Sequence, residues 1–327
     1  MDEKITTTVP CCITGSQAAV VVAETDRHDN PLRTVISTES GLVFSDPRPT
    51  PAEIRHFYRE DYRKKYKNTI TPKNKHILRA GRLALRRIQH VKNHVTPGGS
   101  ILDAGSGGGE FVYICQQAGY QAVGIEPNRG YATFAASQYG IDIFNGFYQD
   151  AKYENAFDCI TLFHVLEHLE EPVSSLSVLA GFLKTGGHFF VEVPNVDFIG
   201  TAPHQKWHVG HLYNFNRQTL VATAALAGLR TLYVETSRDG GVLMATLEKP
   251  AEHYAPDVQQ LIEGSYLQTR KILSGHSQLK HYVRIHTPLK RLVAKVHRGW
   301  NERQTVRQCT GTKPVDILNG LIDNNVP

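Results

Sequence analysis

The stretch that decides the fold is Asp103–Phe111, which reads DAGSGGGEF and directly follows the apolar pair Ile101-Leu102. Glycine loses more conformational freedom on folding than any other residue. Four glycines in nine residues therefore indicate a turn in which some ligand or neighbour requires bare backbone. A glycine-rich turn of this kind, between a buried strand and a helix, typically holds a nucleotide-like ligand.

The residues around the glycines distinguish between three common ligands: a nucleoside triphosphate, a dinucleotide and S-adenosylmethionine. A P-loop needs Lys and then Ser or Thr after its last glycine, whereas Glu110-Phe111 follows here, and a carboxylate would repel a triphosphate. The dinucleotide pattern G-x-G-x-x-G would need glycine at position 110. The residues that do match, in the pattern D-x-G-x-G-x-G, are Asp103, Gly105, Gly107 and Gly109. An acidic side chain at this strand end favours a ligand that carries an ammonium and a sulfonium.

A second acidic residue lies at the end of the next apolar run. Glu126 closes the run GIE, 23 residues after Asp103. An acid at the end of the second strand of such a sheet can accept both hydrogens of a ribose diol. Glu126 therefore supports an adenosine-containing ligand, without choosing which one, over the carboxyl ends of the strands.

From Ser100 onward the pattern alternates between strands and helices. Short apolar runs (ILDA, AVGIE, IDIF, DCITLF and HFFVEV) are separated by segments compatible with helices. This alternation predicts a doubly wound, mostly parallel α/β sheet with helices on both faces. A helix is expected after Asn216, ending at Gly228, and the runs TLYVET and VLMATLEK around RDGG predict a final hairpin.

Four boxes in one order resemble the class I S-adenosylmethionine-dependent methyltransferases of the small-molecule type. They are DAGSGGGEF, GIEPN, FDCITLFHVLEHLEEP and HLYNF, within about residues 98–248. The resemblance implies a seven-stranded Rossmann-like sheet, S-adenosylmethionine as cofactor and direct in-line methyl transfer. That family methylates sugars, quinone precursors, lipids and natural products. The expected acceptor is a small or saccharide-linked molecule, with O-, N- and C-methylation all left open.

The resemblance also implies which residues contact the cofactor. The glycines let the backbone approach it, Asp103 adds negative potential near its amino-acid end, and Glu126 holds the ribose. Relatives often carry Asp after the third strand to bind the adenine amino group, whereas Gly146-Phe147 stands here. The adenine is then expected to stack on Phe147 or to use backbone groups. The full expected set is Asp103, Gly105, Gly107, Gly109, Glu126, Pro127, Phe147, Phe163 and His164.

Two histidine-containing segments are candidates for the acceptor side. The spacing His164…Glu167-His168 predicts one helical turn, but it lacks the internal Glu of H-E-x-x-H, so no metal site is expected. The resemblance implies that His164 borders the cofactor and that His168 faces the acceptor. His168 or His208 is the expected general base, if a base is needed. The alternative for each is a hydrogen bond that only fixes a loop.

The long segment NVDFIGTAPHQKWHVGHLYNF is expected to cover the acceptor. His211 and Tyr213 within it either line the acceptor or fix this loop by hydrogen bonds, and for His211 the loop-fixing role is the one expected. Tyr58, Tyr62 and Tyr66 fall at helical spacing and either reach the pocket or pack.

The sequence predicts four regions along the chain, three of which lie outside the methyltransferase domain. Residues 1–50 resemble the zinc ribbon of relatives, but three of its four presumed ligands are missing and only Cys11 matches, so the shape is expected without metal. Residues 51–97 are expected to form a basic helical cap that begins at Thr50-Pro51. Residues 98–250 are the expected methyltransferase domain, and residues 251–327 a basic helical C-terminal appendage.

Charge is distributed unevenly. The net charge is +5, yet Ile54–Lys92 carry 13 Lys/Arg against 2 Asp/Glu, and Ala251–Trp300 carry 8 against 3. Solvated helix faces explain this, or an anionic acceptor such as a nucleotide sugar or a lipid-linked glycan. The basic flanks also motivate a nucleic-acid methyltransferase, although HVLEH replaces the Asn/Asp-Pro-Pro-Tyr motif used on flipped bases. A non-catalytic module that binds S-adenosylmethionine is the third alternative.

The composition, with 41% hydrophobic and 20% charged residues, is that of an ordinary globular protein. The five cysteines are few and odd in number, which favours a reducing compartment. The sequence shows neither a signal peptide nor 18 consecutive apolar residues, so a cytoplasmic location is expected. The apolar stripe of residues 288–300 leaves peripheral membrane contact, a homodimer contact and packing on its own domain open.

Overall fold

The computed structural model describes residues 4–56, 71–283 and 312–324, together with Val296, Trp300 and Gln304. Two compact units are present: one contains residues 1–50 and 162–285, the other residues 51–161 and 286–327. The predicted roles of Tyr58, Tyr62 and Tyr66, and of most of the stripe 288–300, fall outside the described residues.

The central sheet has seven strands in the order β11-β12-β9-β8-β5-β6-β7. They are β5 (Ser100–Ala104), β6 (Gln121–Ile125), β7 (Ile143–Phe144), β8 (Phe157–Phe163), β9 (Leu183–Pro194), β11 (Arg230–Thr236) and β12 (Val242–Glu248). β5 runs parallel to β6 and to β8, and β6 runs parallel to β7. β12 runs antiparallel to both β9 and β11. The predicted doubly wound, mostly parallel sheet and its final hairpin are therefore confirmed.

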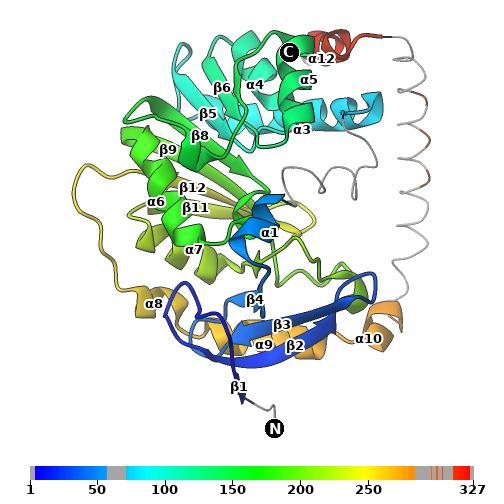
Figure 1. Cartoon of the computed structure of the whole chain (residues 1–327), viewed down its shortest axis with the longest axis vertical. Coiled ribbons are helices and arrows are strands. Elements are labelled where there is room, and N and C mark those ends of the chain that lie inside the picture. The colour runs from blue at the N-terminus through cyan, green and yellow to red at the C-terminus, as the bar shows by residue number, and fades with distance from the viewer. Residues whose placement is uncertain are drawn as a thin grey trace. The chain divides into compact units, whose positions relative to one another are not determined.

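In the unit of residues 51–161 and 286–327, α4 (Glu110–Gln117) packs against β5 and β6, α5 (Arg129–Tyr139) packs against β7, and α3 (Asn74–Lys92) and α12 (Pro314–Asp323) pack against α4 (Figure 1). The unit also contains α1 (Pro51–His56) and the 3-10 turn η2 (Tyr148–Asp150). A Cβ on Gly81 of α3 would lie 2.7 Å from Cδ2 of Leu318 in α12. This close packing ties the C-terminal helix, red in Figure 1, to α3.

Helix α3 separates an apolar face from a basic one. Ile77, Leu78, Ile88 and Val91 are buried, while Leu85 is half-buried. The helix begins at Asn74, because Lys73 still has an extended backbone. No Asp or Glu occurs in Asn74–Lys92, so its solvent side carries only positive charge.

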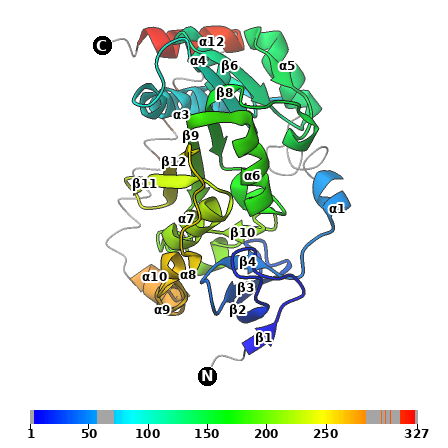
Figure 2. The same ribbon diagram turned by 90° about the vertical axis from the view of Figure 1, so that its left-hand side faces the viewer.

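The unit of residues 1–50 and 162–285 contains a five-stranded antiparallel sheet in the order β1-β2-β3-β4-β10 (Figure 2). Its strands are β1 (Lys4–Thr6), β2 (Ala18–Thr25), β3 (Pro31–Ser37), β4 (Val43–Ser45) and β10 (Tyr213–Asn214). β10 pairs with β4, with Tyr213 opposite Phe44. The N-terminal sheet is thus completed by a strand that comes more than 160 residues later.

Helices and 3-10 turns complete this unit. They are η3 (Leu166–His168), α6 (Pro172–Phe182), η4 (Pro203–Gln205), α7 (Arg217–Leu226), α8 (Val258–Ile262), α9 (Ser265–Gly275) and α10 (Gln278–Val283). Asn216 caps α7 with a capping box shared with Thr219, and Gly228 follows its end with φ of 78°. The helix predicted between Asn216 and Gly228 is therefore confirmed. Within the described ranges, no helix is both long and apolar enough to cross a bilayer.

Candidate functional site

The loop between β5 and α4 has a backbone that only glycine adopts easily. The φ angles of Gly105, Gly107 and Gly109 are 84°, 57° and 82°. All three lie in the left-handed region, which costs other L-residues about 1–2 kcal/mol. The backbone N–H groups of Gly105 and Ser106 donate to the carbonyl of Ile125, at 2.8 and 2.9 Å, and so fix the loop to the end of β6.

Gly109 is required for a second reason. A Cβ at this position would lie 2.5 Å from Cδ1 of Ile141 and 2.8 Å from Cβ of Ala135. Gly109 also precedes the first residue of α4, Glu110, whose buried carboxylate lies in the first turn of the helix. A negative charge there interacts favourably with the helix dipole, as a bound phosphate would. The carboxylate of Glu110 thus places a negative charge at the helix N-terminus, where a bound phosphate would otherwise lie.

Glu126 joins the glycine loop to the turn after β6. Its side chain is 4% exposed. The backbone N–H of Gly107 donates to Oε2 at 2.8 Å, and the N–H of Asn128 donates to Oε1 at 2.9 Å. A carboxylate oxygen offers two lone pairs and can accept more than one hydrogen. The two backbone N–H groups therefore fix both oxygens of Glu126 in place.

Asp103 supplies a buried negative charge at the end of β5. The hydroxyl of Thr161 donates to its Oδ1 at 2.7 Å. Burial and then the charge of Asp103 raise the pKa of the Cys115 and Cys159 thiols, which stay protonated. Ser106 Oγ, in the same loop, is buried and has no hydrogen-bond partner. Bare backbone, two carboxylates and an orphaned hydroxyl fit a cationic adenosyl ligand better than a phosphorylated one.

The candidate adenine contact, Phe147, lies just before η2. The guanidinium of Arg55 in α1 lies over its ring, 5.2 Å from the centroid. Asn145 Nδ2 donates to the carbonyls of Glu126 and Pro127, at 3.0 and 3.4 Å, which holds Pro127 next to the ribose-binding candidate. These residues lie in the same unit as the glycine loop.

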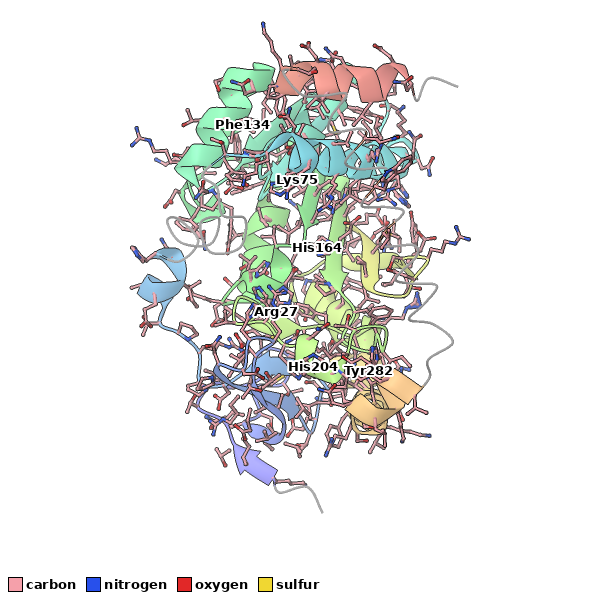
Figure 3. The ribbon with its side chains drawn as sticks, turned by 90° about the vertical axis from the view of Figure 1, so that its right-hand side faces the viewer. Arg27, Lys75, Phe134, His164, His204 and Tyr282 are labelled. Carbon is pink, nitrogen blue, oxygen red and sulfur yellow. The ribbon has the colours of Figure 1, made fainter. Side chains whose placement is uncertain are left out.

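Phe163 and His164 belong to the other unit. The prediction that His164, Glu167 and His168 share one helical turn is wrong, because His164 has φ of 57° and only Leu166–His168 form a 3-10 turn. The side chain of His164, labelled in Figure 3, nevertheless reaches Glu167. Its Nδ1 lies 3.5 Å from Oε1 of Glu167, and its Nε2 lies 3.9 Å from Oε2 of Glu192.

Glu167, His168 and His211 form a cluster that the sequence did not predict. Nδ1 of His168 lies 2.5 Å from the carbonyl of Gly210. Because a carbonyl only accepts, the proton is on Nδ1, and Nε2 faces Oε1 of Glu167 at 3.8 Å. The rings of His168 and His211 lie 4.9 Å apart. Burial raises the pKa of Glu167, but His168, His164 and His211 together lower it below its usual range, so the carboxylate is ionised.

His208 and His211 are neutral imidazoles. Burial, and then Arg27 for His208 and His168 for His211, lower their pKa values to about 4 and about 3. The backbone N–H of Gly210 donates to Nδ1 of His208 at 2.8 Å. Neutral His208 therefore carries its proton on Nε2 and donates from that atom. His204 is exposed near α10, where Nδ1 lies 2.9 Å from Oε1 of Gln278 (Figure 3).

The cluster of Glu167, His168 and His211 is also a candidate metal centre among the described residues. One ligand atom each from Glu167, His168 and His211 lies within 4.8 Å of the others, and Oε2 of Glu167 is buried without a hydrogen-bond partner. Sequence spacing could not reveal this cluster, because His211 comes 43 positions after His168 in the chain. The HLYNF box was the only signal.

Comparisons with known proteins agree with this geometry. The family model of the methyltransferase domain matches residues 54–234, which is more than half of the chain. The ubiquinone biosynthesis O-methyltransferase of Nitrosococcus oceani is 30% identical over 120 residues, which are 33% of this chain and 50% of that protein. The chain thus spans about half the length of the curated relative that it matches.

Two solved structures are similar to the chain at low identity. One is the 1,6-didemethyltoxoflavin-N1-methyltransferase of Burkholderia thailandensis, with 16% identity, a TM-score of 0.48 and coverage of 64% of this chain and 96% of that one. The other is the [4+2]-cyclase SpnF, with 18% identity, a TM-score of 0.45 and coverage of 53% and 82%. The family match over residues 54–234 gives the assignment: the chain belongs to the methyltransferase domain family.

Proposed function

We propose that the chain transfers a methyl group to a small or saccharide-linked acceptor that loses a proton in the reaction. When bound, S-adenosylmethionine supplies an activated methyl group for in-line displacement. The chain's own residues must then bind the cofactor and the acceptor, align the two reacting atoms and exclude water. Alignment alone can raise the rate by several powers of ten.

On the cofactor side, Gly105, Gly107 and Gly109 offer bare backbone, and Glu126 is the proposed partner of the ribose diol. Support comes from the two backbone N–H groups that hold both oxygens of Glu126 at 2.8 and 2.9 Å. Asp103 is proposed to add negative potential near the ligand's cationic groups. Pro127, Phe147, Phe163 and His164 remain predicted contacts.

On the acceptor side, we propose His168 as the proton acceptor, through Nε2. The observation that carries this role is its arrangement, since Nδ1–H is fixed by the Gly210 carbonyl and Nε2 faces the buried Glu167 carboxylate at 3.8 Å. A proton taken at Nε2 creates an imidazolium next to that carboxylate, which stabilises it. For His208, the donor on Nε2 supports hydrogen bonding to the acceptor, and its role as a base stays a prediction.

The experiment is incubation of the protein with methyl-labelled S-adenosylmethionine and a fractionated cell extract. We expect label in a small-molecule or glycan fraction, and none with the His168→Asn variant that still binds S-adenosylhomocysteine. Label in a nucleic-acid fraction would overturn the proposed acceptor class and support the basic flanks as a nucleic-acid surface. Binding without any labelled fraction would favour a non-catalytic module.

A further inference from the structure

Arg48 lies three residues after β4, in the same unit as His168 and His211. Its guanidinium stacks over the ring of Tyr213, 4.1 Å from the centroid, and lies 5.4 Å from the centroid of Phe44. Nη1 donates to the hydroxyl of Tyr213 at 2.5 Å and to the carbonyl of Glu170 at 3.2 Å. The planar head group is therefore held in one orientation, beside the loop that carries His168.

The other edge of this guanidinium has no hydrogen-bond partner among the described residues. Nε and Nη2 of Arg48 are both buried, and neither has a hydrogen-bond partner. These two atoms form the edge with which arginine binds the two oxygens of a carboxylate or a phosphate. Two atoms of one side chain thus lack partners on the side best suited to an oxyanion.

Other arginines in the chain show the same edge occupied. Nε of Arg33 donates to the carbonyl of Asp46 at 2.8 Å, and its Nη2 donates to Oδ2 of the same residue at 2.6 Å. Nε and Nη2 of Arg230 both donate to Oε2 of Glu248, at 3.2 and 2.6 Å. Oxygen atoms of the protein occupy the fork in these two cases, whereas the fork of Arg48 has no partner within the described ranges.

Among the residues described, Arg48 also lacks a direct ion-pair partner, although the carboxylate of Glu171 acts on the same neighbours, Cys12 and Tyr213. In the part of the chain that the structure describes, no carboxylate oxygen forms an ion pair with it within 4.0 Å. Burial raises the pKa of Tyr213, and burial followed by Cys11 raises that of Cys12 to about 12, so both neighbours are neutral. Burying a cation is costly unless an anion pairs with it. Arg48 as a whole is half-buried, so the residue lies near the protein surface.

We propose that the Nε–Nη2 edge of Arg48 binds an anionic group, a carboxylate or a phosphate, of the methyl acceptor. This inference rests on the proposed function, because it assigns a charge to the acceptor that His168 deprotonates. The positions agree with this role: the carbonyl that fixes Arg48 belongs to Glu170, two residues after His168, and Tyr213 is two residues after His211. Arg48 is then a specificity-determining residue for the acceptor.

The test is calorimetry with inorganic phosphate and with benzoate as simple probes, on the full chain saturated with S-adenosylhomocysteine. The wild type should bind at least one of the two anions, and the one that it binds identifies the acceptor group. Arg48→Gln should abolish that binding. Arg48→Lys, which keeps the charge but loses the fork, should weaken it about 10- to 100-fold. The matched control Arg230→Gln, at an exposed arginine already paired with Glu248, should bind like the wild type.

Two results would overturn the inference: a wild type that binds neither anion, and an Arg48→Gln or Arg48→Lys variant that binds as tightly as the wild type. If Arg48→Gln does not fold, anion binding by Arg48→Lys tests the inference. The affinity for S-adenosylhomocysteine is measured in a separate titration. Failure of the wild type to bind it would contradict the proposed function, whereas normal binding without anion binding contradicts only the role of Arg48.

Discussion

The candidate residues fall into two sets, a cofactor half in one unit and an acceptor half in the other, and the two sets are built in different ways. The cofactor half is local: Glu126 lies 19 positions from Gly107, and the loop is shaped by backbone φ angles and backbone hydrogen bonds. The acceptor half is assembled over long distances: Gly210 lies 42 positions from His168, and Tyr213 lies 165 positions from Arg48. A shared ligand can be recognised by a short motif, whereas selectivity for one acceptor depends on side chains that only the folded chain brings together.

The largest expected effect is on kcat, when His168 in the acceptor half is replaced. His168→Asn should lower kcat about 10²- to 10⁴-fold, because the proton acceptor is lost. Its affinity for S-adenosylhomocysteine should stay that of the wild type. His204→Asn is the matched control, since His204 is exposed and its Nδ1 contacts only Gln278 among the bonds described for it. Steady-state kinetics and calorimetry check both halves.

An equal loss of cofactor affinity in His168→Asn would show that the two halves are not separable. A kcat that does not change would exclude His168 as the base.

The converse effect is expected at Glu126. Glu126→Ala removes the acceptor of two backbone N–H groups and the proposed partner of the ribose, so affinity for S-adenosylhomocysteine should fall about 100-fold or more. Glu126→Gln keeps one oxygen acceptor, so its affinity for S-adenosylhomocysteine should lie between those of the wild type and Glu126→Ala. Asp142→Asn, at an exposed carboxylate of the same unit, should leave the affinity unchanged. Tight binding by Glu126→Ala would refute the ribose assignment.

A pair of glycines tests how far the cofactor loop depends on space rather than on backbone angle. Gly109 and Gly119 have nearly the same φ, 82° and 87°, but a Cβ meets Ile141 at 2.5 Å at the first and nothing within 4 Å at the second. Gly119→Ala should cost about 1–2 kcal/mol of unfolding free energy. Gly109→Ala should cost about 1–3 kcal/mol more, because the core is overpacked. Urea unfolding measures both, and equal losses would contradict the steric argument.

The acceptor half should respond to acid more than the cofactor half does. The folded pKa values of His208 and His211, about 4 and about 3, lie below the unfolded value near 6.5. The unfolded chain therefore binds more protons as the pH falls below 6.5, and stability is lost down to the folded pKa, by up to about 1.4 kcal/mol per pH unit and histidine. His208→Gln keeps an acceptor for the Gly210 N–H and should reduce the loss between pH 7 and pH 5. Urea midpoints at the two pH values provide the measurement, and an undiminished loss in the variant would count against a buried neutral His208.

The smallest effect is expected in the N-terminal sheet. Sγ of Cys11 lies 3.1 Å from Oγ of Ser40, and burial raises the pKa of Cys12, whereas structural zinc needs four ligands and deprotonated thiols. A chelator should therefore leave the thermal midpoint unchanged. Elemental analysis that finds one zinc per chain would contradict this expectation.

The sequence predicted elements whose signals are local. The parallel strands, the final hairpin and the capped helix α7 all follow from apolar runs, turn residues and the Asn216 cap. It did not predict β10, because two residues carry too short a pattern to show that they extend a sheet formed by residues 4–45. The left-handed His164 and the start of α3 at Asn74 depended on tertiary packing in the same way. Only the folded structure shows that His211 lies beside His168 and that one edge of Arg48 lacks hydrogen-bond partners among the residues it describes.

The central claim is that carboxylates around a glycine loop select a cationic adenosyl ligand over a phosphorylated one. Calorimetric titration of the wild type with S-adenosylhomocysteine, and in parallel with NADH and ATP, tests it most directly. We expect saturable one-to-one binding of S-adenosylhomocysteine and no measurable heat from either phosphorylated ligand. Binding of NADH or ATP, with none of S-adenosylhomocysteine, would contradict the claim.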